Sequence, residues 1–242
     1  MTQERDYPAS PDEHMLHVRR RETHVPIDAD YAFEESGLLY RLVAAALRGL
    51  ALLVMPVWAH FAADYRIVGR ENLRELEGRG AVLVANHVYF LDAPIICACL
   101  SPARKIRYVT LGENMDIPFA GPIMKALGGL PLPDTPGGMR AFRRTVDDLL
   151  GRGKWVLFLA EGALWPHYRG IRPFRKGGFS FAVRNQVPVV PLVYTFEEGA
   201  FGRERIVLTV GRPMEPGTSA GKLCERTQRY FEETAAAFYA QQ

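Results

Sequence analysis

The chain has 242 residues, 48% of them hydrophobic, and a formal net charge of +3. This length suits one domain with a sizeable hydrophobic core. The near-balanced charge argues against a nucleic-acid-binding protein, so we expect no nucleic-acid partner. The three cysteines, Cys97, Cys99 and Cys224, form neither a disulfide framework nor a four-ligand zinc pattern. We therefore expect free thiols, buried at Cys97 and Cys99, a reducing cytoplasmic setting and no metal site.

Residues 1–36 are polar and include Arg19, Arg20 and Arg21, with no short apolar core at signal-peptide distance. We expect them to form a mobile or loosely packed extension.

Residues 37–63 form an apolar helical segment. From Leu42 to Ala63 it is almost wholly apolar, about the length of roughly 20 residues that a bilayer span needs. Arg48, near its middle, would be costly at membrane depth. The pattern favours one helix, or two short helices bent at Pro56, lying at the membrane interface. The alternative is an ordinary buried helix packed on a sheet.

Residues 64–242 show an alternation of strand and helix patterns, and we assign them to a single domain. The predicted strands are 65–68, 81–85, 106–110, 155–160, 187–194 and 205–210. The predicted helices are 93–100, 117–127, 138–150, 177–184 and a C-terminal helix with anchors at Leu223, Tyr230, Phe231 and Phe238. This alternation predicts a layered α/β domain with a mixed, mostly parallel sheet flanked by helices.

His87 and Asp92 follow the apolar strand pattern of residues 81–85. Histidine titrates near neutral pH and can accept a proton, and a carboxylate on its other ring nitrogen would fix the tautomer. On a regular helix the two side chains would face apart, so they can meet only if the chain turns between them. A helix opened by Asp92 as N-cap, with Pro94 in its first turn, allows that turn. Such a pair, taken alone, is more often structural than catalytic.

Three further segments make the pattern more specific. Residues 112–134 contain Pro118-Phe119-Ala120-Gly121 and Gly128-Gly129-Leu130-Pro131-Leu132, and two later segments are Phe158-Leu159-Ala160-Glu161-Gly162 and Val187-Pro188-Val189-Val190-Pro191-Leu192-Val193. With the His–Asp pair first and these in order, the chain resembles the bacterial 1-acylglycerol-3-phosphate acyltransferase family of glycerolipid acyltransferases, from about Tyr65 to Val210.

This resemblance implies acyl transfer from an acyl thioester, on coenzyme A or acyl carrier protein, to the free hydroxyl of lysophosphatidic acid in phospholipid synthesis. It implies no tightly bound cofactor and an enzyme at the cytoplasmic face of the cell membrane. His87 would be the general base and Asp92 its orienting partner. Glu161 and Gly162 match the motif associated with acceptor binding, and Pro191 matches the last motif.

Two departures bear on the acceptor. The family's Glu-Gly-Thr-Arg is here Glu161-Gly162-Ala163-Leu164, and the acidic–Arg pair of the second motif is replaced by Pro133-Asp134. Two phosphate-binding arginines are therefore missing from their usual places. Arg172, Arg175 and Lys176, just before the helix pattern at 177, are substitute acceptor ligands. The alternatives are that these are solvated loop charges, or that the acceptor has no phosphate.

Several functional readings stay open at this point. One is an acyltransferase for another lysolipid or for a non-phosphate alcohol, and another is a non-catalytic lipid-binding relative. Covalent catalysis is disfavoured because the nearest nucleophile-elbow pattern, residues 178–182, lacks its final glycine. His167 is a spare catalytic candidate, and we favour a loop histidine stacked on aromatic rings.

Overall fold

The computed structural model describes residues 7–11, 13, 15, 24–34, 37–62, 64–100, 106–199 and 202–242. In chain order the elements are α1 (Leu38–Ala62), β1 (Tyr65–Val68), the 3-10 helix η1 (Arg70–Leu76), β2 (Ala81–Ala85), α2 (Asp92–Leu100), β3 (Ile106–Leu111), the 3-10 helix η2 (Gly112–Asp116), α3 (Ala120–Ala126), β4 (Gly129–Leu132), α4 (Pro136–Gly151), β5 (Trp155–Leu159), α5 (Gly177–Asn185), β6 (Val189–Glu198), β7 (Glu204–Val210) and α6 (Ala220–Tyr239).

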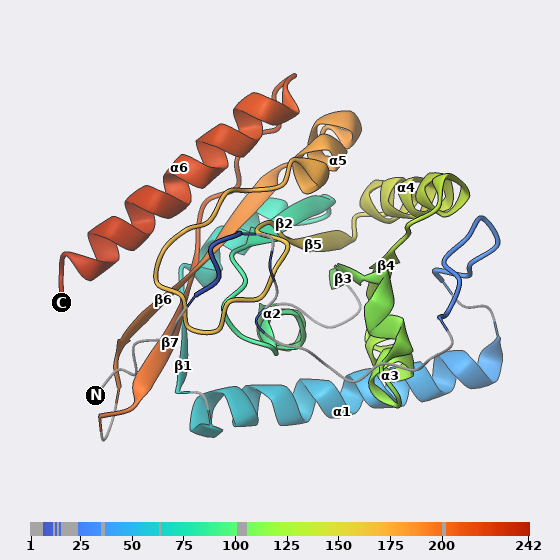
Figure 1. The fold of residues 1–242 in the computed structure, drawn as a ribbon, viewed down its shortest axis with the longest axis horizontal. Coiled ribbons are helices and arrows are strands. Elements are labelled where there is room, and N and C mark those ends of the chain that lie inside the picture. Colours follow the sequence, from blue (N-terminus) through green and yellow to red (C-terminus); the bar gives the residue numbers. More distant parts are fainter. Residues whose placement is uncertain are drawn as a thin grey trace.

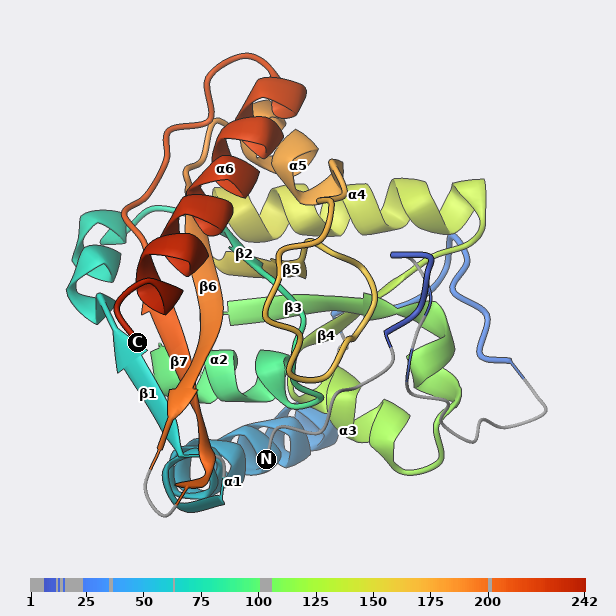
Figure 2. The ribbon, with the colours of Figure 1, turned by 60° about the vertical axis from the view of Figure 1, so that its left-hand side comes forward.

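The strands form a seven-stranded sheet in the order β1-β7-β6-β2-β5-β3-β4. Neighbouring strands are parallel except for β6 and β7, which are antiparallel. Helices α1 and α2 lie on one side of the sheet, and α4, α5 and α6 lie on the other (Figures 1 and 2). The predicted α/β fold with a mixed, mostly parallel sheet is thus confirmed.

The central strand β2 is buried along its whole length. Val82 and Val84 belong to the core cluster that contains Phe142 of α4, whereas Leu83 and Ala85 belong to the cluster on the α2 side. A strand covered on both faces needs a continuous apolar run rather than alternation, as this one has. Its C-terminal end consequently emerges from the middle of the sheet between two packed layers.

The sequence patterns missed β4 and misplaced the start of α3. Strand β4 contains Pro131, and its place at the edge of the sheet tolerates a residue that lacks an N–H donor. The helix expected over 117–127 begins only at Ala120, because η2 ends at Asp116 and Phe119 adopts a positive φ of 62°.

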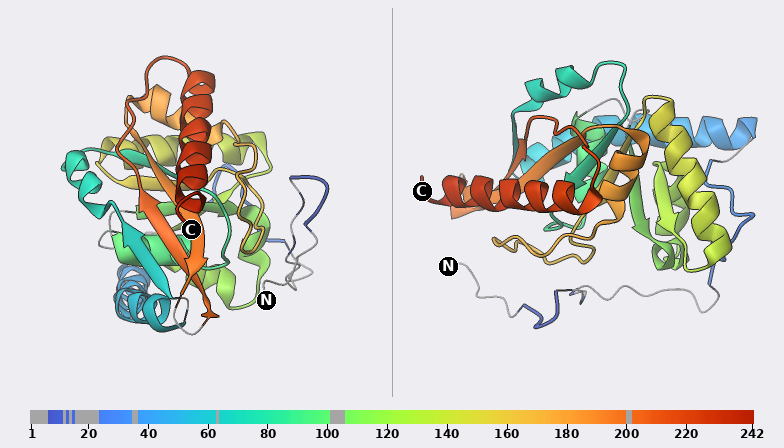
Figure 3. Two further views of the ribbon diagram at one scale, coloured as in Figure 1. Left: turned by 90° about the vertical axis from the view of Figure 1, so that its left-hand side faces the viewer. Right: turned by 90° about the horizontal axis from the view of Figure 1, so that it is seen from above.

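The expectation of a loosely packed N-terminal extension is wrong for residues 24–34. Ile27 and Phe33 are 1% and 9% exposed, and both pack in the core cluster with Phe142. Residues 7–15, where described, run alongside the loop between β5 and α5 (Figures 2 and 3), where Tyr7 stacks on Trp165 at 5.5 Å. Arg19, Arg20 and Arg21 lie outside the described residues.

Helix α1 is a single helix of 25 residues with Pro56 inside it. Within the described part of the chain, Leu38–Phe61 is the one helix long and apolar enough to cross a membrane, by length and composition only, and just 11% of its most apolar stretch is buried. The alternative of a buried core helix is therefore wrong. Its large exposed apolar side chains are Leu38, Leu39, Leu42, Val43, Leu50, Leu53, Val54, Val57 and Phe61.

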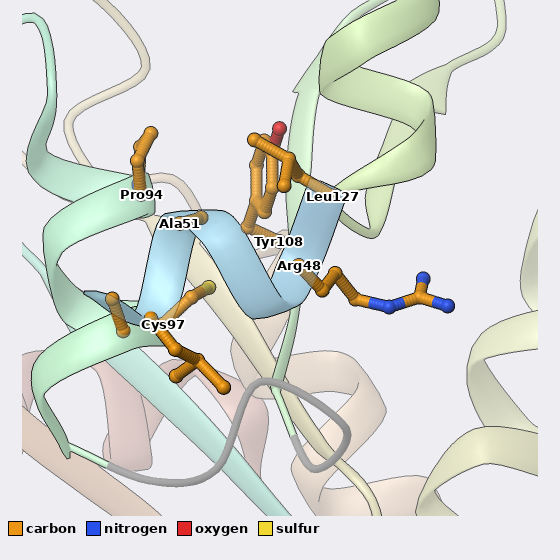
Figure 4. A pocket seen from close by; sticks show the side chains of 8 residues that line it. Arg48, Ala51, Pro94, Cys97, Tyr108 and Leu127 are labelled. Carbon is orange, nitrogen blue, oxygen red and sulfur yellow. The ribbon is translucent and has the colours of Figure 1, made fainter. Parts of the chain in front are cut away.

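The charged residue Arg48 is accommodated in this apolar helix by a hydrogen bond to the body of the protein. Its Nη1 donates a hydrogen bond of 2.8 Å to the backbone oxygen of Ala126, at the end of α3. A pocket of about 20 Å³ lies beside it, between α1, α2 and β3, and Figure 4 shows Cys97 and Tyr108 among its lining residues. Arg48 thus fastens α1 to the body of the protein.

Candidate active site

The loops that carry the predicted site residues begin at the same edge of the sheet. Strands β2 and β5 are adjacent and parallel, with Ala85 paired to Leu159 at their ends. His87 follows β2, and Glu161 follows β5. The carboxyl ends of adjacent parallel strands are the usual place for a ligand site in an α/β fold.

His87 and Asp92 meet, as the sequence predicted. The Nδ1 of His87 lies 2.9 Å from Oδ2 of Asp92, and the two side chains are 17% and 0% exposed. The same carboxylate oxygen accepts the backbone N–H groups of Val88 at 2.9 Å and Tyr89 at 3.0 Å. Asp92 therefore closes the turn and holds the imidazole, instead of capping the N-terminus of α2 as expected.

The ring of His87 has one nitrogen for Asp92 and another for a reacting group. Because Nδ1 faces the carboxylate, the neutral tautomer that fits carries its proton on Nδ1 and leaves the Nε2 lone pair free. The partial exposure of the side chain gives this nitrogen access to solvent. Chemically, this arrangement has what a general base with an orienting carboxylate requires.

Glu161 lies beneath the His87 turn and is 2% exposed. Its carboxylate accepts the backbone N–H of His87 at 3.0 Å and that of Arg172 at 2.9 Å. Burial raises the pKa of the Glu161 carboxyl, while the Arg172 guanidinium and the two N–H groups offset part of that rise. This contact network ties the loop after β5 to the loop after β2.

Arg172 is not placed as a solvent-facing phosphate ligand. Its side chain is 3% exposed and pairs with Glu161 at 2.7 Å, and it also donates to the backbone oxygens of Ala163 and Pro11. The guanidinium lies over the Trp165 ring at 4.5 Å. Contact of Arg172 with an acceptor phosphate stays a prediction, but in this structure the guanidinium is occupied by the protein itself.

Arg175 and Lys176 are placed differently, because both are exposed. The Arg175 side chain packs directly over Gly162, where a Cβ would collide with it, and Gly162 has a φ of 79°. Glycine is therefore required there both for its conformation and for the close approach of the guanidinium. Lys176 directly precedes α5, whose first N–H groups favour an anion.

His167 forms a second histidine–carboxylate contact, with Glu204 at 2.5 Å. Its ring stacks on Phe196, with 5.4 Å between centroids, which confirms the interpretation as a loop histidine stacked on aromatic rings. Although burial raises the pKa of Glu204, the hydrogen bonds from His167 and Arg169 lower it overall. Through their contacts with Glu204, His167 and Arg169 attach the loop between β5 and α5 to the start of β7.

The cysteines offer no activated nucleophile. All three are free; Cys97 and Cys224 are buried and Cys99 is partly buried, so full burial was expected wrongly for Cys99. Burial raises the pKa of the Cys97 thiol to about 12. In the described residues, no group of three or more histidine, cysteine or acidic side chains is arranged to hold a metal ion.

A larger cavity of about 310 Å³ lies between α1, β1 and α2, with Tyr65 and Cys99 among its lining residues. Neither this cavity nor the small pocket of Figure 4 is lined by His87. The His87 side chain is 17% exposed, at the carboxyl end of β2.

Sequence reasoning missed two residues that shape the site. Asn86 is wholly buried and bonds the backbone of Tyr194 on β6, and Tyr194 accepts a hydrogen bond from Tyr65 at 2.7 Å. The position of Asn86, directly before His87, was the only available signal. Tyr194 looked like one more apolar strand residue.

Comparison with known proteins identifies a family for this chain. Residues 64–195 match the family model described as Acyltransferase. The chain is 29% identical over 178 residues, 69% of its length, to the Brassica napus chloroplastic 1-acyl-sn-glycerol-3-phosphate acyltransferase BAT2, covering 50% of that protein. It is 27% identical over 168 residues, 62% of its length, to a Saccharomyces cerevisiae protein of the same name, covering 52% of it. The chain thus spans about half the length of these curated relatives.

A solved structure shares the fold. The crystal structure of PlsC, the 1-acyl-sn-glycerophosphate (LPA) acyltransferase from Thermotoga maritima, matches with a TM-score of 0.60 and 21% sequence identity, covering 86% of both chains.

Proposed function

The chain belongs to the acyltransferase family that residues 64–195 match, and from this premise we propose that it is a membrane-associated O-acyltransferase acting on lysophosphatidic acid. The observation that supports the reaction is the His87–Asp92 contact of 2.9 Å at the end of β2, with the imidazole reaching solvent. The names of the relatives support the acceptor. The acyl donor is an acyl thioester, on coenzyme A or acyl carrier protein.

In the proposed reaction the acceptor hydroxyl attacks the thioester carbonyl directly. Nε2 of His87 removes the hydroxyl proton as the new C–O bond forms, and Asp92 stabilises the resulting imidazolium. When the tetrahedral intermediate collapses, the C–S bond breaks and the imidazolium returns the proton to the leaving thiolate. The products are the ester and the free thiol. A positioned base of this kind contributes about 10²–10⁴ in rate.

The acceptor would lie between His87 and the loop between β5 and α5. We propose that Arg175 and Lys176 bind its phosphate, in place of the two arginines missing from the family's motifs. Arg175 is supported by its position over Gly162, beside the buried Glu161. Glu161 and Gly162 shape this acceptor site, and Arg172 supports it through its ion pair with Glu161.

The exposed apolar face of α1 supports the membrane part of the proposal. Its side chains Leu53 and Phe61 are each 72% exposed. Burying a leucine or phenylalanine side chain is worth about 1.5–3 kcal/mol, so several together favour an apolar surface over water. The membrane would be met on its cytoplasmic face, with α1 lying at the interface.

The decisive experiment is a thiol-release assay with purified protein, one acyl-CoA and a set of acceptors. We expect release that depends on lysophosphatidic acid, that is lost in His87→Ala and that is kept in His24→Gln. Acyl carrier protein carrying the same chain tests the donor.

The missing motif arginines favour a second candidate, an acyltransferase for another lysolipid or for a non-phosphate alcohol. Release with such an acceptor but not with lysophosphatidic acid would select it. Vesicle binding without release by any acceptor would indicate a lipid-binding relative and overturn the enzymatic proposal.

A further inference from the structure

Two tyrosine hydroxyls are hydrogen-bonded to each other in the core beside the catalytic pair. The hydroxyl of Tyr65 donates to that of Tyr194 at 2.7 Å, and Tyr194 is 2% exposed. Burial raises the pKa of Tyr194, and the charge of Asp92 raises it further. Both tyrosines therefore act as neutral hydrogen-bonding groups near the carboxylate that holds His87.

Asp92 has a carboxylate oxygen that lacks a donor, and Tyr194 has a hydroxyl proton that can be donated. Oδ2 of Asp92 accepts from His87, Val88 and Tyr89, whereas Oδ1 is buried and has no partner among the described residues. The Tyr194 hydroxyl accepts from Tyr65, so its own proton is available for another acceptor. Tyr194 packs in the same core cluster as Val88 and Ala93, the residues on either side of the Asp92 turn, and Tyr65 packs against that cluster. In keeping with this placement, the charge of Asp92 contributes to the raised pKa of Tyr194. Buried polar groups are rarely left unpaired.

The backbone of Tyr194 is fixed to the residue that precedes His87. Oδ1 of Asn86 accepts the N–H of Tyr194 at 2.8 Å, and Nδ2 of Asn86 donates to the Tyr194 oxygen at 3.2 Å. The Asn86 amide thereby extends the pairing of β2 with β6 beyond Ala85 and Leu192, the last pair in the ladder. Any movement of the His87 turn is therefore resisted at Tyr194.

We propose that Tyr194 is a positioning residue for the acyl transfer, whose hydroxyl, supported by Tyr65, donates to Oδ1 of Asp92 and fixes the plane of that carboxylate against His87. With both oxygens engaged, the carboxylate cannot rotate about its Cβ–Cγ bond without losing a hydrogen bond. Oδ2 then stays aimed at Nδ1, and Nε2 stays aimed at the acceptor. This role rests on the proposed function of the His87–Asp92 pair.

Tyr194→Phe removes a single oxygen and keeps the ring in the core. We expect kcat to fall about tenfold, with both KM values unchanged, because the hydrogen bond to a charged group is lost while no ligand contact is. A carboxylate with one donor fewer holds a proton on the imidazole more strongly. The acidic limb of the pH–rate profile should consequently move to higher pH.

Other titratable groups near Asp92 could also affect the acidic limb of the pH–rate profile, so they must be considered as controls. The groups that interact with Asp92 are His87, Tyr89, Tyr65 and Tyr194, and Tyr65 also interacts with Cys99. Tyr194→Phe also removes the acceptor of the Tyr65 hydroxyl, and Tyr65→Phe controls for that loss, whereas His87, Tyr89 and Cys99 keep their side chains. A shift of the acidic limb in this variant would then report the lost hydroxyl.

Tyr108→Phe is the matched control, because Tyr108 is also buried and its hydroxyl donates to the backbone oxygen of Met124, away from the pair. We would measure kcat, both KM values, the pH–rate profile and Tm for both variants and for Tyr65→Phe. The Tyr65 variant should show a smaller fall in kcat and a smaller shift, because it removes the support and not the donor. Titration of the His87 imidazole by NMR gives the same comparison without substrate, with a midpoint moved to higher pH in Tyr194→Phe.

Wild-type kcat and an unchanged profile in Tyr194→Phe would overturn the proposal, as would an equal effect in Tyr108→Phe. If Tyr194→Phe fails to fold, Tyr65→Phe decides, and unchanged kcat and profile there would also overturn it. Retained activity in His87→Ala is a separate result: it would remove the proposed function, while the NMR titration would still test the tyrosine contact.

Discussion

Arg172 and Glu161 form an ion pair at 2.7 Å in which both side chains are almost completely withdrawn from solvent. Removing one partner of such a pair leaves the other charge buried and unpaired. We expect Arg172→Ala to lower the free energy of unfolding by about 3–5 kcal/mol, measured by denaturant titration. Arg169→Ala, in the same loop, removes an exposed arginine paired with Glu204 and should cost about 1 kcal/mol or less.

The same pair of variants separates a supporting role from a ligand role for Arg172. If Arg172→Ala leaves stability unchanged and raises only the acceptor KM, the guanidinium contacts the acceptor and the supporting role is wrong.

Arg175 and Lys176 are exposed cations, and the Arg175 side chain packs directly over Gly162. A hydrogen bond to a charged group is worth about 1.5–3 kcal/mol, so each alanine variant should raise the acceptor KM about tenfold or more. The donor KM should stay constant, and steady-state kinetics with each substrate varied in turn will show the difference. Arg169→Ala serves again as the control. An equal rise in both KM values would contradict phosphate binding at these residues.

The exposed face of α1 predicts binding to lipid vesicles. Replacing Leu53 or Val57, which are 72% and 57% exposed, by glutamate should lower partitioning into anionic vesicles about tenfold per residue while leaving Tm unchanged. Sedimentation with vesicles measures the partitioning. Ala237→Glu, on the exposed face of α6 across the sheet, should have no effect. Equal binding by all four proteins would show that α1 is not the contact surface.

The contact between His24 and Asp116 predicts a stability that depends on pH. The hydrogen bond that Nδ1 of His24 donates to the Asp116 carboxylate, at 2.6 Å, raises the pKa of His24 above its ordinary value of 6.5. Since the folded-state pKa is the higher one, this contribution is fully present below about pH 6.5 and is lost as pH rises through the folded-state value. We expect wild type to exceed His24→Gln in Tm at pH 5.5, and this difference to shrink at pH 9. A difference that grows with pH would contradict the assignment.

The sequence was most informative where local pattern and function coincide. A continuous apolar run identified β2, and the polar residues after it identified His87 and Asp92, because a strand end and a short turn are local features. The partner of Arg172 could not be predicted this way. Eleven positions separate it from Glu161 through an irregular loop, and whether an arginine turns inward depends on the cover that Trp165 and Pro11 provide.

Other parts of the site depend on contacts between distant segments. Tyr194 and Asn86 are separated by 108 positions and meet only because β6 is inserted beside β2. The burial of Ile27 likewise depends on α4 being nearby. In a single sequence, the residue types at these positions indicate burial, but they do not indicate which distant residue each one contacts.

The hydrogen bond from Arg48 to the Ala126 carbonyl has a geometric consequence for the proposed membrane contact of α1. An apolar helix held only by side-chain packing can rotate about its long axis at little energetic cost. Rotation of α1 would instead break the hydrogen bond between the Arg48 guanidinium and the Ala126 carbonyl. The exposed apolar face of α1 is therefore held pointing away from the body of the protein. On the proposed function, His87 would then keep one orientation relative to the membrane that α1 contacts, and a lipid acceptor in that membrane would approach the imidazole from one direction.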